Sequence, residues 1–206
     1  MKKFFLLAGM AAMMATTVVT FDSCKKGAED PAISLLSRKA RLVGDWKLTK
    51  GTTTQTSQGG TVTITTYDGT NETTGSSSSP YTMTISFAKD GTFKSVTTST
   101  QSNSFYTAVS TQTTTGTWDF NSGVGDVKAK TIVSLHPTTE TNETVTTISG
   151  SSPSTNTSTT NYTSTSYSQE FTLLELSNKE LHITLNDVST GSSYSNSIID
   201  YTLTAQ

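Results

Sequence analysis

The sequence predicts an all-β fold: an antiparallel up-and-down barrel, or a sandwich, of eight to ten strands behind a short N-terminal helix. Three observations predict it. Apolar residues alternate with Thr or Ser over short segments such as residues 81–87, YTMTISF, and this period of two is typical of a strand with one buried face. Asp68-Gly69 and Asp90-Gly91 are strong hairpin signals, because Gly tolerates positive φ. No helical pattern interrupts the segments after Gly44, which favours antiparallel sheet.

Before the folded part, residues 1–23 resemble a signal peptide. Two lysines precede an apolar stretch at residues 4–19, which is shorter than the roughly 20 residues that a spanning helix needs. Cys24, the single Cys of the chain, follows Ser23 directly. A small residue before Cys at this point resembles a lipobox, although Phe21 and Asp22 fit that pattern poorly. We expect a lipoprotein acylated at Cys24; the alternative is a membrane anchor ending in an incidental Cys.

The odd Cys supports acylation, because a lone thiol in an exported protein cannot pair within its chain. Two or more acyl chains give stable anchoring where one is marginal. Lys25 follows Cys24 where an Asp would favour the inner membrane in some bacteria, so we expect an outer-membrane protein on the periplasmic face or the cell surface. The expected organisation is a signal peptide at 1–23, a tether at 24–30 and one domain at 31–206.

The first expected element of the domain is a short amphipathic helix. Asp30 and Pro31 form a helix start with an N-cap and a first-turn proline. Apolar residues then recur at helical spacing until about Leu42. The expected strands that follow are residues 43–50, 60–67, 81–88, 92–100, 105–120 (bent or split), 130–136, 143–149, 162–176, 179–187 and 194–204.

Threonine makes up about a fifth of the chain, far above ordinary usage. Such a bias fits either a disordered stalk or Thr-rich strands, since Thr is β-branched. The alternation at residues 81–87, at Val62 and Ile64, and at 181–185 favours strands with a Thr/Ser outer face. Residues 150–161 lack the alternation, so we expect a mobile loop there.

The mature chain carries 12 basic and 15 acidic side chains, a net charge of −3. It has no basic patch, and we therefore expect no nucleic-acid partner.

An ordered set of short motifs resembles the lipocalin-like, calycin-type lipoproteins of the Bacteroidota. Gly44-Asp45-Trp46 opens the first strand after the helix and is similar to the lipocalin G-x-W motif. Three further segments follow in the same order, at residues 87–93 (FAKDGTF), 116–120 (GTWDF) and 174–181 (LELSNKEL). The resemblance implies a barrel whose floor holds Gly44 and Trp46. It departs from lipocalins because the late Arg that stacks on the Trp is missing; Arg41 could reach Trp46 instead.

The resemblance also implies a ligand site. A barrel of eight or more strands can hold one small molecule, so we expect a small apolar or amphipathic ligand, with Met83, Ile85 and Phe93 lining the lumen. Core packing is the competing role of the aromatic residues Trp46, Phe87, Phe93, Trp118 and Phe120. The alternative function is a β-sandwich surface module that binds glycan or protein through exposed Tyr106, Tyr162 and Tyr167.

The sequence contains few residues in patterns typical of catalytic or metal sites. His136 and His182 show no second His, Cys or paired carboxylate at ligand spacing, and His182 is expected to face solvent. Asp119 and Asp126 flank a glycine turn, where solvated carboxylates are the simpler interpretation than a calcium site. We expect no enzyme, metal or cofactor; a hydrolase that uses His136 or His182 with a carboxylate ranks last.

Overall fold

The computed structural model describes residues 36–206 except 58, 122–130, 164–167 and 190–194. This part contains the short helix α2 (Arg38–Leu42) and eleven strands. The signal peptide, Cys24, the tether, the Asp30-Pro31 helix start, Asp126 and Tyr167 lie outside the described residues. The strands are β1 (Gly44–Ser57), β2 (Val62–Tyr67), β3 (Asn71–Thr74), β4 (Ser77–Phe87), β5 (Thr92–Ser102), β6 (Tyr106–Phe120), β7 (Ile132–Ile148), β8 (Ser154–Asn161), β9 (Gln169–Leu176), β10 (Glu180–Ser189) and β11 (Ser195–Ala205).

The strands close into an antiparallel barrel, as the sequence predicts. The first and last strands pair over most of their length, from Trp46 opposite Ala205 to Ser57 opposite Ser195. At one end of the barrel β1 pairs directly with β4, and at the other end the β2–β3 hairpin is inserted between them. Eight strands close the ring where β1 pairs with β4 and where Ile132–Leu135 of β7 pair with β9. The β2–β3 hairpin brings the number of strands in the barrel to ten, and from Thr139 on β7 pairs with β8, which lies outside the ring. This closure makes the sandwich alternative wrong.

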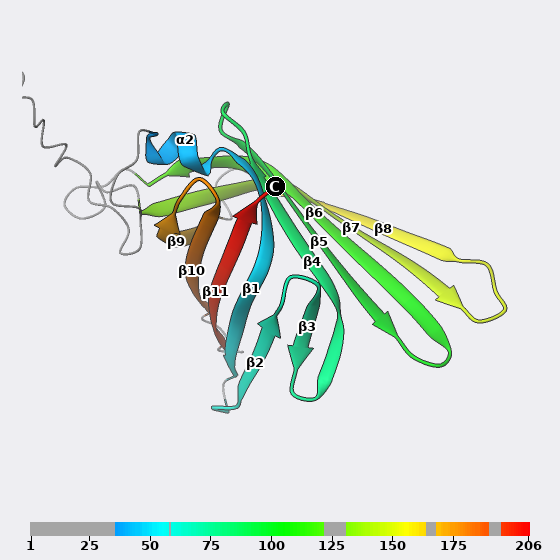
Figure 1. The fold of residues 1–206 in the computed structure, drawn as a ribbon. Helices are drawn as coiled ribbons and strands as arrows, with labels where there is room; N and C mark the ends of the chain where they lie inside the picture. Colours follow the sequence, from blue (N-terminus) through cyan, green and yellow to red (C-terminus); the bar gives the residue numbers. More distant parts are fainter. Residues whose placement is uncertain (1–35, 58, 122–130, 164–167, 190–194) are drawn as a thin grey trace, which may run out of the picture.

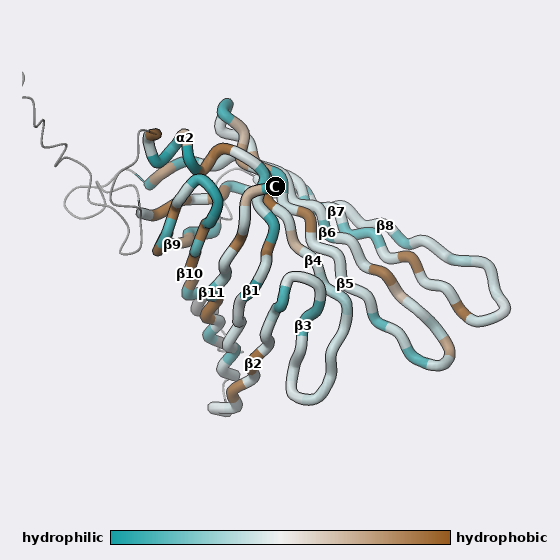
Figure 2. The backbone as a smooth tube through the Cα atoms, in the orientation of Figure 1, coloured by the Kyte–Doolittle hydropathy of each residue, from teal (hydrophilic) through white to brown (hydrophobic). Residues whose placement is uncertain are grey.

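The two ends of the barrel differ in shape and composition. Around α2 and the C-terminus the strands converge, and from there β4 to β8 diverge from β1, β10 and β11 (Figure 1). We call these the closed end and the splayed end. Hydrophobic residues gather on the strands near the closed end, while the outer parts of β5 to β8 are largely polar (Figure 2).

The closed end holds the hydrophobic core. Alternate residues of each strand turn inward there, and Leu42, Leu176, Leu181, Leu203 and Val133 are fully buried. The remaining core residues are Trp46, Leu48, Ile85, Phe87, Phe93, Trp118, Leu135, Phe171, Leu173 and Tyr201. Aromatic rings contribute edge contacts, for example Phe87 against Trp118 with centroids 5.4 Å apart. The apolar side chains fill this end as small barrels usually do.

Two glycines permit tight approaches in the barrel wall. Gly51 on β1 pairs with Tyr201 on β11, and a Cβ at Gly51 would meet the Tyr201 ring at 2.5 Å. Gly116 on β6 pairs with Phe93, and a Cβ there would meet the Phe93 ring at 2.8 Å and the His136 carbonyl at 2.2 Å. In both places an aromatic ring covers a backbone that has no side chain of its own, which is possible only with Gly.

Several sequence predictions need correction. The segment expected to be a mobile loop forms β8, and the two strands expected at 130–136 and 143–149 form the single strand β7. The sequence does not predict the hairpin strand β3. Val62 and Ile64 face outward and are 55% and 53% exposed. Tyr67 on the same strand faces inward, and residues at an odd spacing from it face the opposite way.

Candidate functional site

Gly44, Asp45 and Trp46 lie at the closed end, where β1 begins. Gly44 has φ of 148°, which favours glycine. Trp46 is 2% exposed and donates its indole N–H to the Leu42 carbonyl over 2.8 Å, which joins β1 to the end of α2. Arg41 donates from Nη1 to the carbonyl of Leu176 on β9. The helix is thus bonded to strands on two sides and covers the floor of the barrel.

A cation–π contact lies at Trp118. Arg41 is directed to the Leu176 carbonyl, while the ammonium group of Lys39 lies 5.5 Å from the ring centroid of Trp118. This contact belongs to the other tryptophan of the chain, which is also buried in the core. A cation–π contact of this kind is worth about 0.5–1 kcal/mol at an exposed site.

The three expected lumen residues do point inward, but two of them belong to the packed floor. Ile85 is 5% exposed and Phe93 is 4% exposed, and both contact the core. Met83 lies one inward position further from the floor and is half-buried at the edge of the core. Met83 is therefore the expected residue that reaches the open part of the interior.

Three tyrosines form a cluster above the floor: Tyr67 on the hairpin strand β2, Tyr81 on β4 and Tyr201 on β11. The rings of Tyr67 and Tyr81 are 4.8 Å apart, and those of Tyr67 and Tyr201 are 5.3 Å apart. The hydroxyls of Tyr201 and Thr53 share a hydrogen bond of 3.2 Å. Burial raises the pKa of Tyr81 to about 12 and also raises that of Tyr201. These phenols stay neutral at physiological pH, so the tyrosine cluster presents ring faces together with hydroxyl donors.

The inner face of β5 to β8 is polar, in contrast to the tyrosine cluster. Strand register places Met83 level with Thr97, Gln112, Asn142 and Ser158 on successive strands. The next level away from the floor runs from Tyr81 through Ser99, Ser110, Thr144 and Asn156. Residues level with each other on adjacent strands share a face of the sheet, so the inner surface changes from aromatic to hydroxyl and amide across the sheet.

Glu140 on β7 organises this polar wall, which we define as Gln112, Glu140, Asn142, Thr144, Asn156 and Ser158. The Asn142 amide donates to Glu140 Oε1 over 2.9 Å, and the Tyr162 hydroxyl donates to Oε2 over 3.1 Å. Hydrogen bonds from Asn142, Gln112 and Tyr162 lower the pKa of Glu140, so it is ionised at neutral pH. A groove of about 540 Å³ lies along β7 and β8, lined by Asn142, Thr144, Thr146, Ser154, Thr155, Asn156 and Ser158.

The sequence did not reveal this wall for a physical reason. Between Thr115 and Gly116 of β6 the register to β7 shifts, because Thr138 is an extra residue on β7. A bulge of this kind reverses which residues face inward beyond it. Inward residues change from Val133 and Leu135 to Glu140 and Asn142, so no unbroken alternation runs through the strand. The tyrosines could have been found, since Tyr81 and Tyr201 continue the apolar alternation of their strands.

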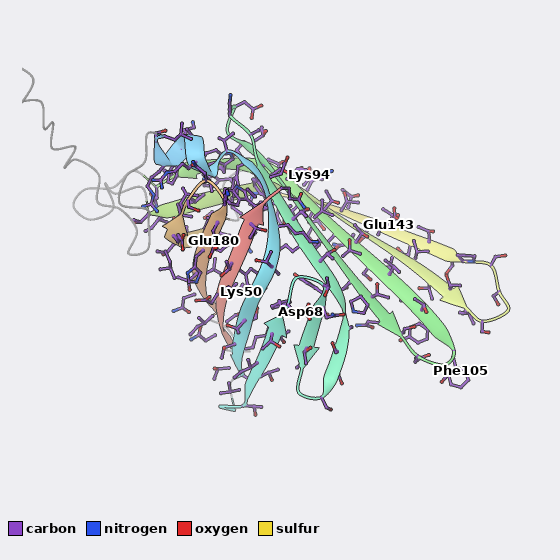
Figure 3. The ribbon with its side chains drawn as sticks, viewed as in Figure 1. Lys50, Asp68, Lys94, Phe105, Glu143 and Glu180 are labelled. Carbon is purple, nitrogen blue, oxygen red and sulfur yellow. The ribbon has the colours of Figure 1, made fainter. Side chains whose placement is uncertain are left out.

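The outer surface carries features of a different kind. A shallow groove of about 470 Å³ lies on β4 to β7, bordered by Ser86, Lys94, Thr115 and Thr138 and reached by the edge of Phe93. Val62, Ile64 and Ile198 form an exposed apolar patch, since register places Ile64 and Ile198 on either side of Thr54. At the far tip of the splayed end, Phe105 is 75% exposed (Figure 3).

Both histidines have carboxylate neighbours that the sequence did not suggest. His182 Nε2 lies 2.9 Å from Asp200 Oδ1, and its side chain is 19% exposed rather than solvated as expected. His136 Nε2 lies 3.5 Å from Asp119 Oδ2. These pairs bridge neighbouring strands, out of phase with the core residues. Across the described ranges, no group of three or more His, Cys, Asp or Glu side chains could hold a metal ion.

Among the residues that the structure places, no helix has the length and apolar character needed to cross a bilayer. No protein-family model matches the sequence, and a search of curated proteins finds no match. Among solved structures the chain is similar to Ail, the attachment invasion locus protein of Yersinia pestis. The TM-score is 0.32 with 5% identity, over 79% of this chain and 98% of that chain. At this TM-score the likeness carries no conclusion about fold or function.

Proposed function

We propose that this chain is an exported lipoprotein, acylated at Cys24 and anchored in the outer membrane, whose barrel binds a small amphipathic molecule at the splayed end. Binding rather than catalysis is the proposed role. The anchor is supported by the signal-peptide pattern and the single Cys of the sequence. The ligand class is supported by the interior of the barrel.

The observation that carries the ligand proposal is the two-sided interior above the floor. One side offers the tyrosine cluster, Met83 and the half-buried Ile183, Leu185 and Ile199. The other side offers the polar wall around Glu140. Ligand sites in proteins combine apolar contacts with a few placed polar groups. An amphipathic molecule matches both sides, whereas a purely apolar one would leave the polar wall without partners.

The ligand proposal can be tested with octyl maltoside below its micelle concentration. Calorimetry on the full chain carrying Cys24→Ser avoids competing acyl chains. Met83→Thr should weaken binding by about five-fold or more, because it removes apolar contact area at the edge of the floor. Ile64→Thr makes a similar change in the outer apolar patch and should leave binding unchanged. If Ile64→Thr loses binding while Met83→Thr binds as tightly as the parent, an interior site is contradicted.

The anchor is tested separately. Cys24→Ser should leave the protein uncleaved or release it from the membrane fraction, because the acylated thiol is lost. Ser23→Ala keeps a small residue before the Cys and serves as the matched control, with normal anchoring. Retention and mobility of Cys24→Ser identical to those of the parent would contradict acylation at this residue.

A further inference from the structure

The polar wall carries hydrogen-bonding groups but little charge. At the inward positions of β5 to β8 that the structure describes, the side chains are Ser, Thr, Asn, Gln, apolar residues and the single carboxylate Glu140. Lys94 lies on the outer face, level with Ser86 and Thr115. An anionic head group would therefore meet a carboxylate and no cation, which is unfavourable. The wall suits a neutral group rich in hydroxyls.

The wall is also held in place for hydroxyl recognition. Asn142 uses one amide N–H in its bond to Glu140, and an Asn side chain has a second N–H and a carbonyl oxygen to offer. The hydroxyls of Ser110 and Thr144 share a bond of 3.1 Å at the next level. Groups fixed in this way bind a ligand with less loss of side-chain entropy.

We propose that the polar wall is a sugar subsite, which binds the hydroxyl groups of a glycosylated amphiphile while the apolar part of that molecule contacts the tyrosine cluster. This inference rests on the proposed function and names the head group of its ligand. The groove of about 540 Å³ beside Asn142 falls within the size range of small-molecule sites.

The spacing of the two sides fits one molecule. Tyr81 and Thr144 are level with each other and three strands apart in register, through Ser99 and Ser110. Neighbouring strands lie about 4.8 Å apart, so the separation along the sheet is roughly 14 Å. A sugar with a short alkyl chain can reach from one side to the other.

The experiment compares two amphiphiles that share an octyl tail. Calorimetry measures binding of octyl maltoside and octyl phosphocholine, each below its micelle concentration, to the full chain carrying Cys24→Ser. We expect the maltoside to bind about five-fold more tightly or better, the effect of one to two net hydrogen bonds. Equal affinity for the two head groups, or preference for the phosphocholine, would overturn the sugar subsite and leave amphiphile binding intact. No binding of either compound would overturn both proposals.

Substitutions in the polar wall test whether this wall causes the preference for the maltoside. Asn142→Leu, of similar size, should abolish the preference for the maltoside while retaining octyl-tail binding, and Gln112→Leu should reduce it. Glu143→Gln lies on the exposed outer face of the same strand and should leave the preference unchanged. A preference that survives both Asn142→Leu and Gln112→Leu in folded protein would place the sugar elsewhere and overturn the inference.

Discussion

The closed end and the splayed end use the same antiparallel pairing but bury their side chains very differently. At the closed end Leu42, Leu181 and Leu203 are fully buried, whereas all eight residues of β8 are exposed. Antiparallel backbone pairing runs through both ends, so pairing alone does not make a solid core. Apolar side chains decide which end is filled, and the Thr-rich end keeps its inner face available to solvent and ligand.

Loss of the floor tryptophan should produce the largest difference between the two ends. Trp46→Ala removes a fully buried ring and its bond to Leu42, and should lower the free energy of unfolding by about 3–5 kcal/mol. Thr157→Ala on exposed β8 should change it by less than about 0.5 kcal/mol. Urea unfolding measures the free energy of unfolding of both variants. Similar losses in the two would contradict the division into a packed closed end and an open splayed end.

The same substitution on opposite faces gives the next largest effect. Ile85→Thr removes buried methyl groups and buries a hydroxyl, which should destabilise the protein by about 2–4 kcal/mol. Ile64→Thr changes a side chain that is 53% exposed and should cost less than about 0.5 kcal/mol. Thermal unfolding of the pair tests the phase of β2, since a large loss in Ile64→Thr would mean that this residue is buried.

A methyl group at the β6–β7 bulge should have a smaller but clear effect. Gly116→Ala would place Cβ against the His136 carbonyl and the Phe93 ring, and overpacking of this kind costs about 1–3 kcal/mol. Gly59→Ala is the control, because nothing lies within 4 Å of a Cβ there. Equal unfolding midpoints for Gly116→Ala and the parent would show that the strands can separate at the bulge.

The smallest expected effect is a pH dependence at the turn between β2 and β3. Asp68 accepts hydrogen bonds from the backbone N–H groups of Thr70 and Asn71 at 2.9 and 2.7 Å, which lower its pKa well below the ordinary value. The unfolded carboxyl titrates near pH 3.9, so its contribution to stability is present above that pH and is lost as pH falls further. Asp68→Asn keeps an acceptor without titration.

Stability of Asp68→Asn should therefore fall less steeply than that of the parent below about pH 4. Chemical denaturation at several acidic pH values measures the slopes. Parallel slopes for the two proteins would show that the turn carboxylate is not linked to folding.

The comparison also explains how far the sequence could predict the structure. On β4 the apolar alternation is unbroken, so the inward direction of Ile85 and Phe87 and the barrel class could be predicted. At the splayed end Thr and Ser occupy both faces of the strands, so the sequence pattern does not indicate which residues face inward. For that reason the sequence predicts a loop where β8 forms and predicts the wrong face for Val62 and Ile64. The polar wall was hidden for a further reason, because the extra Thr138 reverses the alternation within β7.

Chemical-shift mapping with octyl maltoside tests the central claim most directly, because the inner surface and the outer apolar patch compete for the same ligand. If the splayed interior is the site, the largest shifts will fall on Tyr81, Met83 and Asn142. The contrary result is a set of shifts centred on Val62, Ile64 and Ile198, with the tyrosine cluster and the polar wall unaffected.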